Sequence, residues 1–257
     1  SRSDLDRWVL SALHGLIETV TNMLDAYDCT GAARAIEQFI DELSNWYIRR
    51  SRRRFWKTDD DKDKMAAYST LYECLNTLSR LLAPFTPFIA EEIYRNLTTR
   101  IDPSEPESVH LASWPKSNKA LIDKELNEGM RLIQRLASLG RAARSKAGLK
   151  VRQPLSELLI GLREPTERLM IEKHETMLLE ELNVKAVRIA DSSEDLIGYI
   201  VKPNLSILGP RMGKTVGKLR QALEELDPET AVEIARTVQR GEKVRVAGFD
   251  LKANELF

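Results

Sequence analysis

The sequence has little from which a metal centre or a disulfide framework could be built. Its 257 residues include only two cysteines, Cys29 and Cys74, which lie far apart, and three histidines that show no metal-ligand spacing. We therefore expect neither a zinc site nor a disulfide-stapled secreted fold. No apolar run approaches the roughly 18 residues of a membrane span, and the first residues do not resemble a signal peptide. These absences predict a cytoplasmic protein, in form a piece of a longer chain.

Net charge is also absent. The chain has 39 Lys and Arg residues against 39 Asp and Glu residues, so its formal net charge is zero. A uniformly basic coat for nucleic acid is excluded, and any nucleic-acid site must be local. With 42% hydrophobic and 30% charged residues, the composition is that of a globular protein and excludes a disordered chain.

The first half of the chain is predicted to be helical. From Leu5 to Tyr27, apolar residues recur at steps of three and four, and Ser3 before an acidic first turn fits a helix N-cap. Pro84 and Pro87 end a later helix, because proline lacks the N–H that a helix needs. Similar patterns predict helices over residues 4–27, 31–56, 65–82, 88–97 and 123–146.

The second half changes period. An apolar run at 158–162 and alternation at 184–189 indicate strands around a helix over 165–182. One or two more strands are expected at 197–208, then helices over 211–226 and 228–240 and a hairpin at 241–251. We predict a mainly α protein. An antiparallel helical bundle over residues 1–153 is followed by a small α+β domain over 154–257.

The densest charge of one sign lies at the end of the second predicted helix. Six of the nine residues from Arg49 to Lys57 are basic. At ~100° per residue, one sector of that helix, away from its apolar stripe, carries Arg49, Arg52, Arg53 and Trp56. Arginine matches phosphate oxygens, and an exposed indole can stack on an unpaired base. The alternative is a solvated, salt-bridged helix end in which the tryptophan packs.

Two arginines of the same run continue the apolar stripe. Arg50 and Arg54 are expected to snorkel from the edge of the bundle or to pair with carboxylates. Candidate partners are Glu91, Glu92 and Asp59–Asp61.

The helix predicted at 123–146 carries charge of only one sign over its second half. Between Gly129 and Arg152 there are seven basic residues and no acidic one. Ordinary surface helices mix both signs, because opposite charges three or four residues apart stabilise them. This pattern favours a polyanion partner over a plain solvated face. The basic and small polar face comprises Arg131, Gln134, Arg135, Ser138, Arg141, Ser145 and Lys146, and Lys150 and Arg152 extend it into the next loop; the apolar face comprises Leu132, Ile133, Leu136, Leu139 and Ala143.

Other motifs offer no catalytic chemistry. Residues 209–215 (GPRMGKT) are similar to a phosphate-binding loop, but only three residues separate the glycines and the first of them is proline, which has no N–H. His14 is expected on the polar side of its helix, and neither it, His110 nor His174 has a serine or carboxylate at motif spacing. We predict no catalytic residues and no metal ligands.

Several segments together resemble isoleucyl-tRNA synthetases. The most specific is 45–56 (NWYIRRSRRRFW), which resembles a signature of the helical anticodon-binding domain in that family. In the same order as in the family stand LDRW (5–8), LAPFTPF (82–88), SVHL (108–111), WP (114–115), AGLKVRQPL (147–155), ELNVK (181–185), KPN (202–204) and LGP (208–210). The resemblance covers nearly the whole chain. The catalytic HIGH and KMSKS segments, the editing domain and a C-terminal cysteine zinc module of the family are not found in it.

The resemblance implies that the parent enzyme joins isoleucine to tRNA(Ile) with ATP and magnesium. This piece would hold the anticodon stem-loop, use no cofactor itself, and have the catalytic and editing domains of the same polypeptide as further partners. The expected tRNA contacts combine this region with the helical geometry: Arg49, Arg52, Arg53, Trp56, Arg131, Arg135, Arg141, Lys146, Lys150 and Arg152. The competing hypothesis is a helical scaffold whose basic faces dock an acidic protein.

Overall fold

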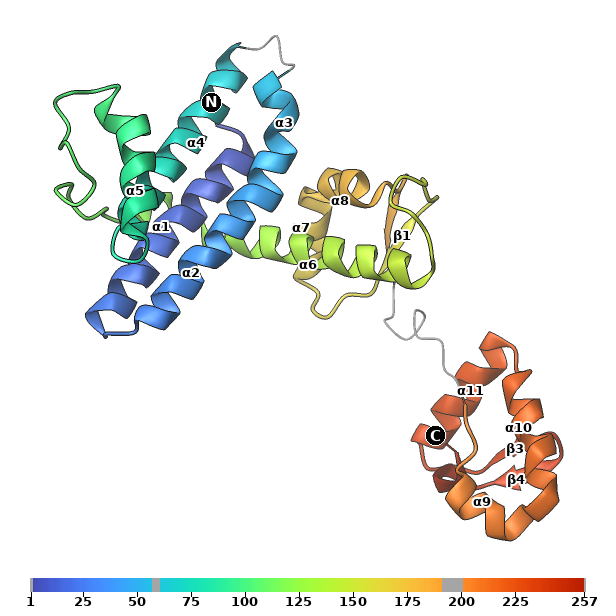
Figure 1. Ribbon diagram of the computed structural model, residues 1–257. Helices are drawn as coiled ribbons and strands as arrows, with labels where there is room; N and C mark the ends of the chain where they lie inside the picture. Colours follow the sequence, from blue (N-terminus) through green and yellow to red (C-terminus); the bar gives the residue numbers. More distant parts are fainter. Residues whose placement is uncertain (1, 57–60, 191–200, 257) are drawn as a thin grey trace. The chain divides into compact units, whose positions relative to one another are not determined.

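The computed structural model describes residues 2–56, 61–190 and 201–256, and the mainly α prediction is confirmed (Figure 1). The chain forms two compact units, Ser1–Ser138 and Leu139–Phe257, which divide inside one helix. The predicted domain boundary at 153/154 stays a prediction.

The first unit is a bundle of helices, as the period of apolar residues predicts. Its elements are α1 (Asp4–Asp25), α2 (Cys29–Glu42), a π-helical turn (Leu43–Ile48), α3 (Arg49–Trp56), α4 (Asp61–Leu82), α5 (Pro87–Tyr94), a second π turn (Arg95–Thr99), a 3-10 turn (Lys119–Leu121) and the first part of α6 (Lys124–Lys146). α1 packs against both α2 and α4. Ser3 caps α1 as predicted, because its side chain accepts from the Asp6 N–H while Asp6 Oδ2 accepts from the Ser3 N–H.

The core of this unit comes from the apolar faces of four helices. Buried side chains from α1, α2, α4 and α6 include Trp8, Val9, Leu13, Ile17, Ile36, Phe39, Leu78, Leu81, Met130 and Ile133. One feature of the predicted helix over 31–56 is different. The π turn interrupts it, and such a turn adds a residue to one helical turn.

The π turn changes which side chains of α3 face the core. Continued at ~100° per residue, the apolar stripe of α2 would pass through Arg50 and Arg54. The added residue rotates α3, so Ser51 and Phe55 are buried and Arg50 and Arg54 are half-buried. The outer sector retains the four predicted members, Arg49, Arg52, Arg53 and Trp56, all of which are exposed.

The second unit begins with the end of α6 and a small parallel pair of strands. β1 (Leu158–Ile160) and β2 (Val187–Ile189) pair in parallel, with Leu158 opposite Val187. Between them the predicted helix over 165–182 is two helices, α7 (Glu167–Lys173) and α8 (Glu175–Leu182), which break at His174. Asn183 follows in the left-handed conformation with a φ of 49° and ends α8.

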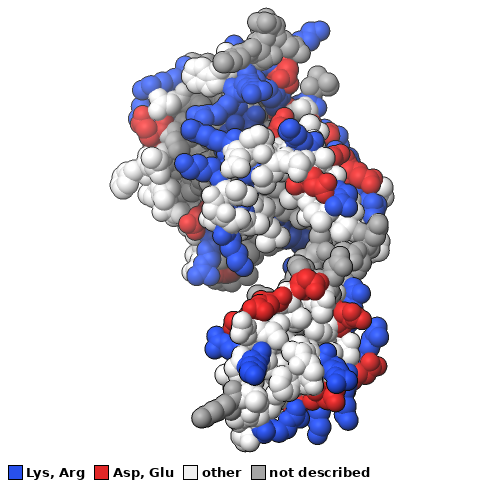
Figure 2. Space-filling view, turned by 90° about the vertical axis from the view of Figure 1, so that its right-hand side faces the viewer, with Lys and Arg blue, Asp and Glu red and all other residues white. Residues whose placement is uncertain are grey.

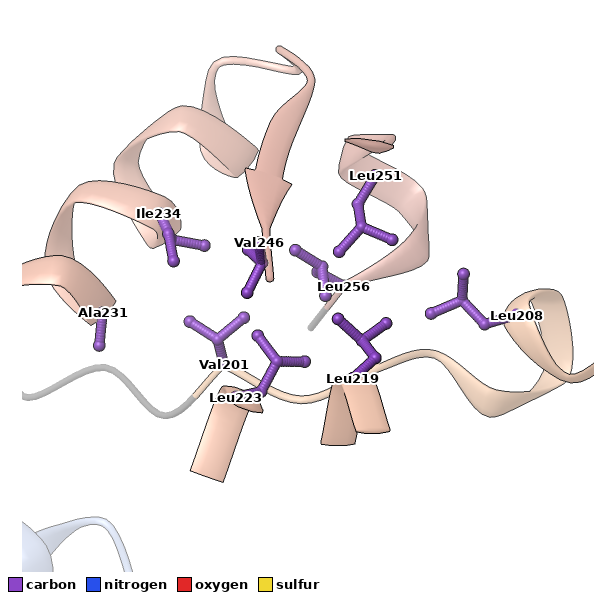
Figure 3. Packing of buried hydrophobic residues seen from close by; sticks show 9 residues of the cluster. All are labelled: Val201, Leu208, Leu219, Leu223, Ala231, Ile234, Val246, Leu251 and Leu256. Atoms are coloured by element: carbon purple, nitrogen blue, oxygen red, sulfur yellow. The ribbon is translucent and has the colours of Figure 1, made fainter. Parts of the chain in front are cut away.

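Residues 201–256 form their own apolar core (Figure 3). The elements are α9 (Leu205–Met212), a 3-10 turn (Gly213–Thr215), α10 (Val216–Glu224), α11 (Pro228–Gln239), β3 (Val244–Val246), β4 (Phe249–Leu251) and a final 3-10 turn (Ala253–Glu255). The buried cluster joins residues distant in sequence, among them Val201, Leu219, Ile234, Leu251 and Leu256. The predicted helices and the antiparallel hairpin with its turn at Gly248 are confirmed.

Two predictions for this segment are settled differently. The strands expected at 197–208 are wrong where the structure describes them, because 205–208 begin α9 and Pro203 forms only an isolated bridge with Leu256. Residues 197–200 lie outside the described residues. The segment similar to a phosphate-binding loop is no loop over 209–212, since these residues complete α9 and contain Pro210 within the helix.

Candidate nucleic-acid interface

α3 separates its arginines into one that is bound by carboxylates inside the bundle and three that face solvent. Arg54 donates from Nη1 and Nη2 to the two carboxylate oxygens of Asp6, at 2.8 and 2.7 Å. The same guanidinium donates from Nε and Nη2 to Asp63, at 2.9 and 2.7 Å. Its side chain is 16% exposed and that of Asp6 is fully buried. Arg54 is thus compensated by two carboxylates and belongs to the fold.

Asp6 gathers further donors around this pair. The Tyr47 hydroxyl donates to Asp6 Oδ1 at 2.7 Å, and the Ser3 hydroxyl donates to Oδ2 at 2.8 Å. Burial of the Asp6 carboxyl raises its pKa, but the hydrogen bonds from Arg54, Tyr47 and Ser3 outweigh burial and hold the pKa below its usual value. Burial and the neighbouring Asp6 raise the pKa of the Tyr47 hydroxyl. Asp6 therefore stays ionised and fixes the start of α1 to the end of α3.

The predicted pairing of inner arginines with carboxylates is right in kind for Arg54, but its partners differ from those named. Glu91 instead accepts hydrogen bonds from the Ser108 hydroxyl and the Val109 N–H. Asp59 and Asp60 lie outside the described residues. The Arg50 guanidinium lies over the Trp46 ring, 5.5 Å from its centroid.

The outer face of α3 presents a different chemistry. The Arg49 guanidinium donates from Nε to the Asn45 carbonyl at 2.8 Å and lies 5.9 Å from the Trp46 ring centroid. Arg52 and Arg53 are exposed, and no carboxylate of the described residues lies within 4 Å of either guanidinium. Trp56 is 81% exposed, so its indole has an open face at the end of the helix. The hypothesis that Trp56 is a packing residue is wrong.

The first part of α6 also turns basic side chains to solvent. Leu132, Ile133 and Ala137 are buried in the first unit, whereas Arg131 and Arg135 are exposed. The predicted apolar face does not continue to the end of the helix. Leu139 is 57% exposed and Ala143 is also exposed.

In the second unit the predicted basic face is partly neutralised. Arg141 Nη1 donates to Glu181 Oε2 at 3.0 Å, and the Glu181 side chain is only 4% exposed. The sequence of α6 conceals this pair, because the carboxylate arrives from α8, 40 residues later. Lys146, Lys150 and Arg152 are exposed.

Arg144 is a positioning residue, although its sequence shows it only as one more basic residue of α6. It is 4% exposed, and its guanidinium donates to the carbonyls of Lys150 and Gln153 at 3.1 and 3.0 Å. It also donates to the carbonyls of Leu182 and Asn183, at 2.7 and 3.2 Å. A buried arginine that holds both ends of the loop after α6 sets the backbone on which Lys150 and Arg152 stand.

Figure 2 shows how charge is distributed over one side of the molecule. Lys and Arg side chains gather over part of the helical region, with few Asp and Glu side chains among them. On the C-terminal segment, residues 201–256, both signs are interspersed. The zero net charge is therefore an uneven distribution, as predicted from the charge pattern.

The remaining polar side chains do not form a second centre. His14 is buried, contrary to its predicted place on the polar side of the helix, and its Nδ1 accepts from the Asn118 N–H at 3.1 Å. Over residues 2–56, 61–190 and 201–256, no group of three or more His, Cys, Asp or Glu side chains could hold a metal ion. Within the same ranges, no helix combines the length and hydropathy that crossing a bilayer requires.

Residues 6–159 match the family model described as the anticodon-binding domain of tRNA ligase. The chain is 56% identical over 184 residues to an isoleucine–tRNA ligase of Dehalococcoides mccartyi (strain CBDB1), covering 72% of this chain and 18% of that protein. It is 46% identical over 224 residues to the isoleucine–tRNA ligase of Thermus thermophilus, covering 87% and 22%. For that of Clostridium tetani the identity is 39% over 257 residues, covering 99% and 24%. The chain thus spans about a fifth of the length of these curated relatives.

Proposed function

This chain belongs to the family of anticodon-binding domains of tRNA ligases, and on that premise we propose that it binds the anticodon stem-loop of an isoleucine-accepting tRNA. The family model matches more than half of the chain, and the curated relatives are isoleucine–tRNA ligases. We propose that it serves such a ligase as its tRNA-gripping part, in the cytoplasm.

The observation that carries the proposal is the division of labour among the arginines of α3. Arg54 is satisfied by Asp6 and Asp63 within the bundle, so its charge is accounted for by the fold. Arg52 and Arg53 face solvent beside an indole that is 81% exposed. An exposed large aromatic beside uncompensated cations stabilises nothing in the bundle, whereas an RNA loop offers a partner for both.

The chemistry of the grip is binding, with no bond made or broken by these residues. Arg52 and Arg53 would neutralise phosphates of the loop strand, which sets the register of the RNA and makes affinity dependent on salt. Trp56 would stack on an unpaired base, an interaction worth about 1–3 kcal/mol per base. Arg49, Arg131 and Arg135 are proposed as further contacts of the first unit.

The second unit contributes separately. Lys146, Lys150 and Arg152 are proposed as phosphate contacts on the end of α6 and the loop that Arg144 holds. Arg141 is the weakest of the predicted contacts, because a phosphate would have to compete with Glu181 for its guanidinium. The ligase reaction, which joins isoleucine to tRNA with ATP and magnesium, is proposed for the parent enzyme, and no residue of this chain is proposed to hold those cofactors.

A titration of the chain with isoleucine tRNA at several salt concentrations tests the proposal. The logarithm of the association constant should fall linearly with the logarithm of salt, with a slope of about −0.7 to −0.9 per neutralised phosphate. A response that is flat at low ionic strength would overturn it. Saturable binding of an acidic protein without any binding of tRNA would favour the scaffold hypothesis instead.

A further inference from the structure

The first unit contains a pocket that the predicted contacts do not explain. It lies between α1, α2 and α6 and has a volume of about 290 Å³. That is close to the lower end of the range for small-ligand clefts, about 300–1,000 Å³. Its floor is formed in part by the buried rings of Trp8 and Phe39, and its wall by polar side chains. A small, flat and partly polar ligand suits such a lining.

Gly15 opens this pocket from the middle of α1. A glycine inside a helix destabilises it relative to alanine, so its presence calls for a reason in packing. No heavy atom lies within 4 Å of the position that a Cβ on Gly15 would occupy. Packing within the described residues therefore does not require a glycine here, and the missing side chain leaves room for a ligand.

The polar groups at the pocket are a carboxylate, a guanidinium and two amides. Gln38 Nε2 donates to Glu42 Oε1 at 3.1 Å. Arg131 interacts electrostatically with Glu42, but no carboxylate of the described residues lies within the 4 Å of an ion pair with it. The side-chain oxygen of Asn127 is buried and has no hydrogen-bond partner in the described part of the chain. Glu42 and Arg131 thus line one cavity without closing on each other.

The Glu42 carboxylate still has room for donors. Burial raises its pKa, while the hydrogen bond from Gln38 and the charge of Arg131 lower it in part. A partly desolvated carboxylate gains from each further N–H donor that reaches it. The best ligand therefore presents donors to Glu42 and an acceptor to Arg131.

Resting on the proposed RNA-binding function, the geometry points to a pocket for one unpaired guanine base of the bound loop. The N1–H and 2-amino groups of guanine are two adjacent donors that a carboxylate can accept together. Its O6 and N7 are acceptors for which arginine is the commonest partner. Adenine would present an acceptor to the carboxylate, and uracil a single donor between two carbonyls. Cytosine offers one amino donor and no matching acceptor pair for the guanidinium.

Inosine in place of guanosine tests this assignment, because it removes only the 2-amino group. Stem-loop RNAs with a single guanosine at each loop position in turn, and their inosine counterparts, are titrated against the full chain. At one position, inosine should weaken binding to the unaltered protein by about tenfold or more, which is the effect of losing a hydrogen bond to a charged group. The variant Glu42→Gln should bind the two RNAs within about twofold of each other.

Two further variants separate the pocket from the fold. Glu37→Gln removes an exposed carboxylate of the same helix outside the pocket and should keep the preference for guanosine. Gly15→Leu should remove the preference by filling the pocket, and it should not lower the melting temperature, because leucine favours helix over glycine. Thermal melting of each variant by circular dichroism reports the fold.

The outcomes distinguish the pocket from the proposed function. If the unaltered chain binds the stem-loops with the expected salt slope but never distinguishes guanosine from inosine, the pocket assignment is overturned and RNA binding stands. The assignment is equally overturned if Glu37→Gln and Glu42→Gln have the same effect. If no stem-loop binds at all, the proposed function fails first.

Discussion

Asp6 holds Arg54 with both carboxylate oxygens, at 2.8 and 2.7 Å, although the two residues are 48 positions apart in the chain. The pair joins the first turn of α1 to the last turn of α3, and Tyr47 and Asp63 complete its hydrogen bonds. Because Arg54 is oriented inward by this pair, its neighbours Arg52 and Arg53 stand on the opposite, exposed side. A structural ion pair thus sets the direction of the candidate RNA-binding face.

Asp6→Asn should destabilise the chain strongly. It keeps the shape of the side chain but leaves Arg54, which is 16% exposed, to rely on Asp63 for charge compensation. Breaking a buried ion pair from one side costs about 3–5 kcal/mol of unfolding free energy, and urea denaturation measures it. The control is Asp4→Asn in the same helical turn. Its partner Arg7 is exposed, so a loss of under about 1 kcal/mol is expected there. Equal losses in the two variants would contradict a special role for Asp6.

The same pair should give stability a specific dependence on pH. The folded pKa of Asp6 is lowered below its unfolded value of about 3.9, so the stabilisation is present above that value and is lost as pH falls through the folded pKa. The difference in unfolding free energy between the unaltered chain and Asp6→Asn should therefore be constant near neutral pH and shrink below about pH 4. His14, whose pKa burial lowers, titrates in both proteins and cancels in the difference. Urea denaturation at a series of pH values checks this, and a difference that grows on acidification would refute the assignment.

Neutralising the outer arginines of α3 should change the salt dependence of tRNA binding. For Arg52→Gln combined with Arg53→Gln, the slope of log affinity against log salt should become less steep by about 1.4–1.8 if each arginine neutralises one phosphate. The control pairs Arg95→Gln with Arg100→Gln, which removes the same charge from exposed arginines elsewhere in the first unit. Filter binding at several salt concentrations measures both slopes. A control that changes the slope as much would mean that only net charge matters.

Trp56 should contribute by stacking and not by packing. Because its side chain is 81% exposed, Trp56→Ala should change the unfolding free energy by less than about 0.5 kcal/mol. Its loss should weaken tRNA binding by about 1–3 kcal/mol with an unchanged salt slope, since stacking neutralises no phosphate. Trp46, which is 5% exposed, is the opposite case, and Trp46→Ala should cost about 3–5 kcal/mol of stability. Binding and unfolding measured on both variants test this division.

Arg141 should matter more for stability than for RNA. Arg141→Ala removes a hydrogen bond to the nearly buried Glu181 and should cost about 1–2 kcal/mol of unfolding free energy, allowing for the partial exposure of the arginine. Lys146→Ala, on the same helix and exposed, should cost less than about 0.5 kcal/mol and weaken tRNA binding more. If Arg141→Ala were the variant that lost more affinity, the ion pair with Glu181 would not be its main role.

Local patterns were sufficient for most of the helices and for part of the candidate site. The 3.6-residue period, the Ser3 cap and the prolines after α4 predict α1, α4 and α6 closely, because these signals act within a few residues. Exposure of Arg49, Arg52, Arg53 and Trp56 was also predicted from their common sector. The similarity of residues 45–56 to a signature of the family indicated the same region from sequence alone.

Features that depend on distant residues were not accessible in this way. The π turn at Leu43–Ile48 rotates α3 relative to α2, and the helical period contains no sign of it. The partners of Arg54 and Arg141 come from α1, α4 and α8, and the pocket beside Glu42 exists only where α1, α2 and α6 meet. Amino-acid order determines which residues are charged and which face of a helix they share. Which of those charges are neutralised depends on side chains that folding brings within a few ångströms, so the choice between a structural and a binding arginine was made by the tertiary structure.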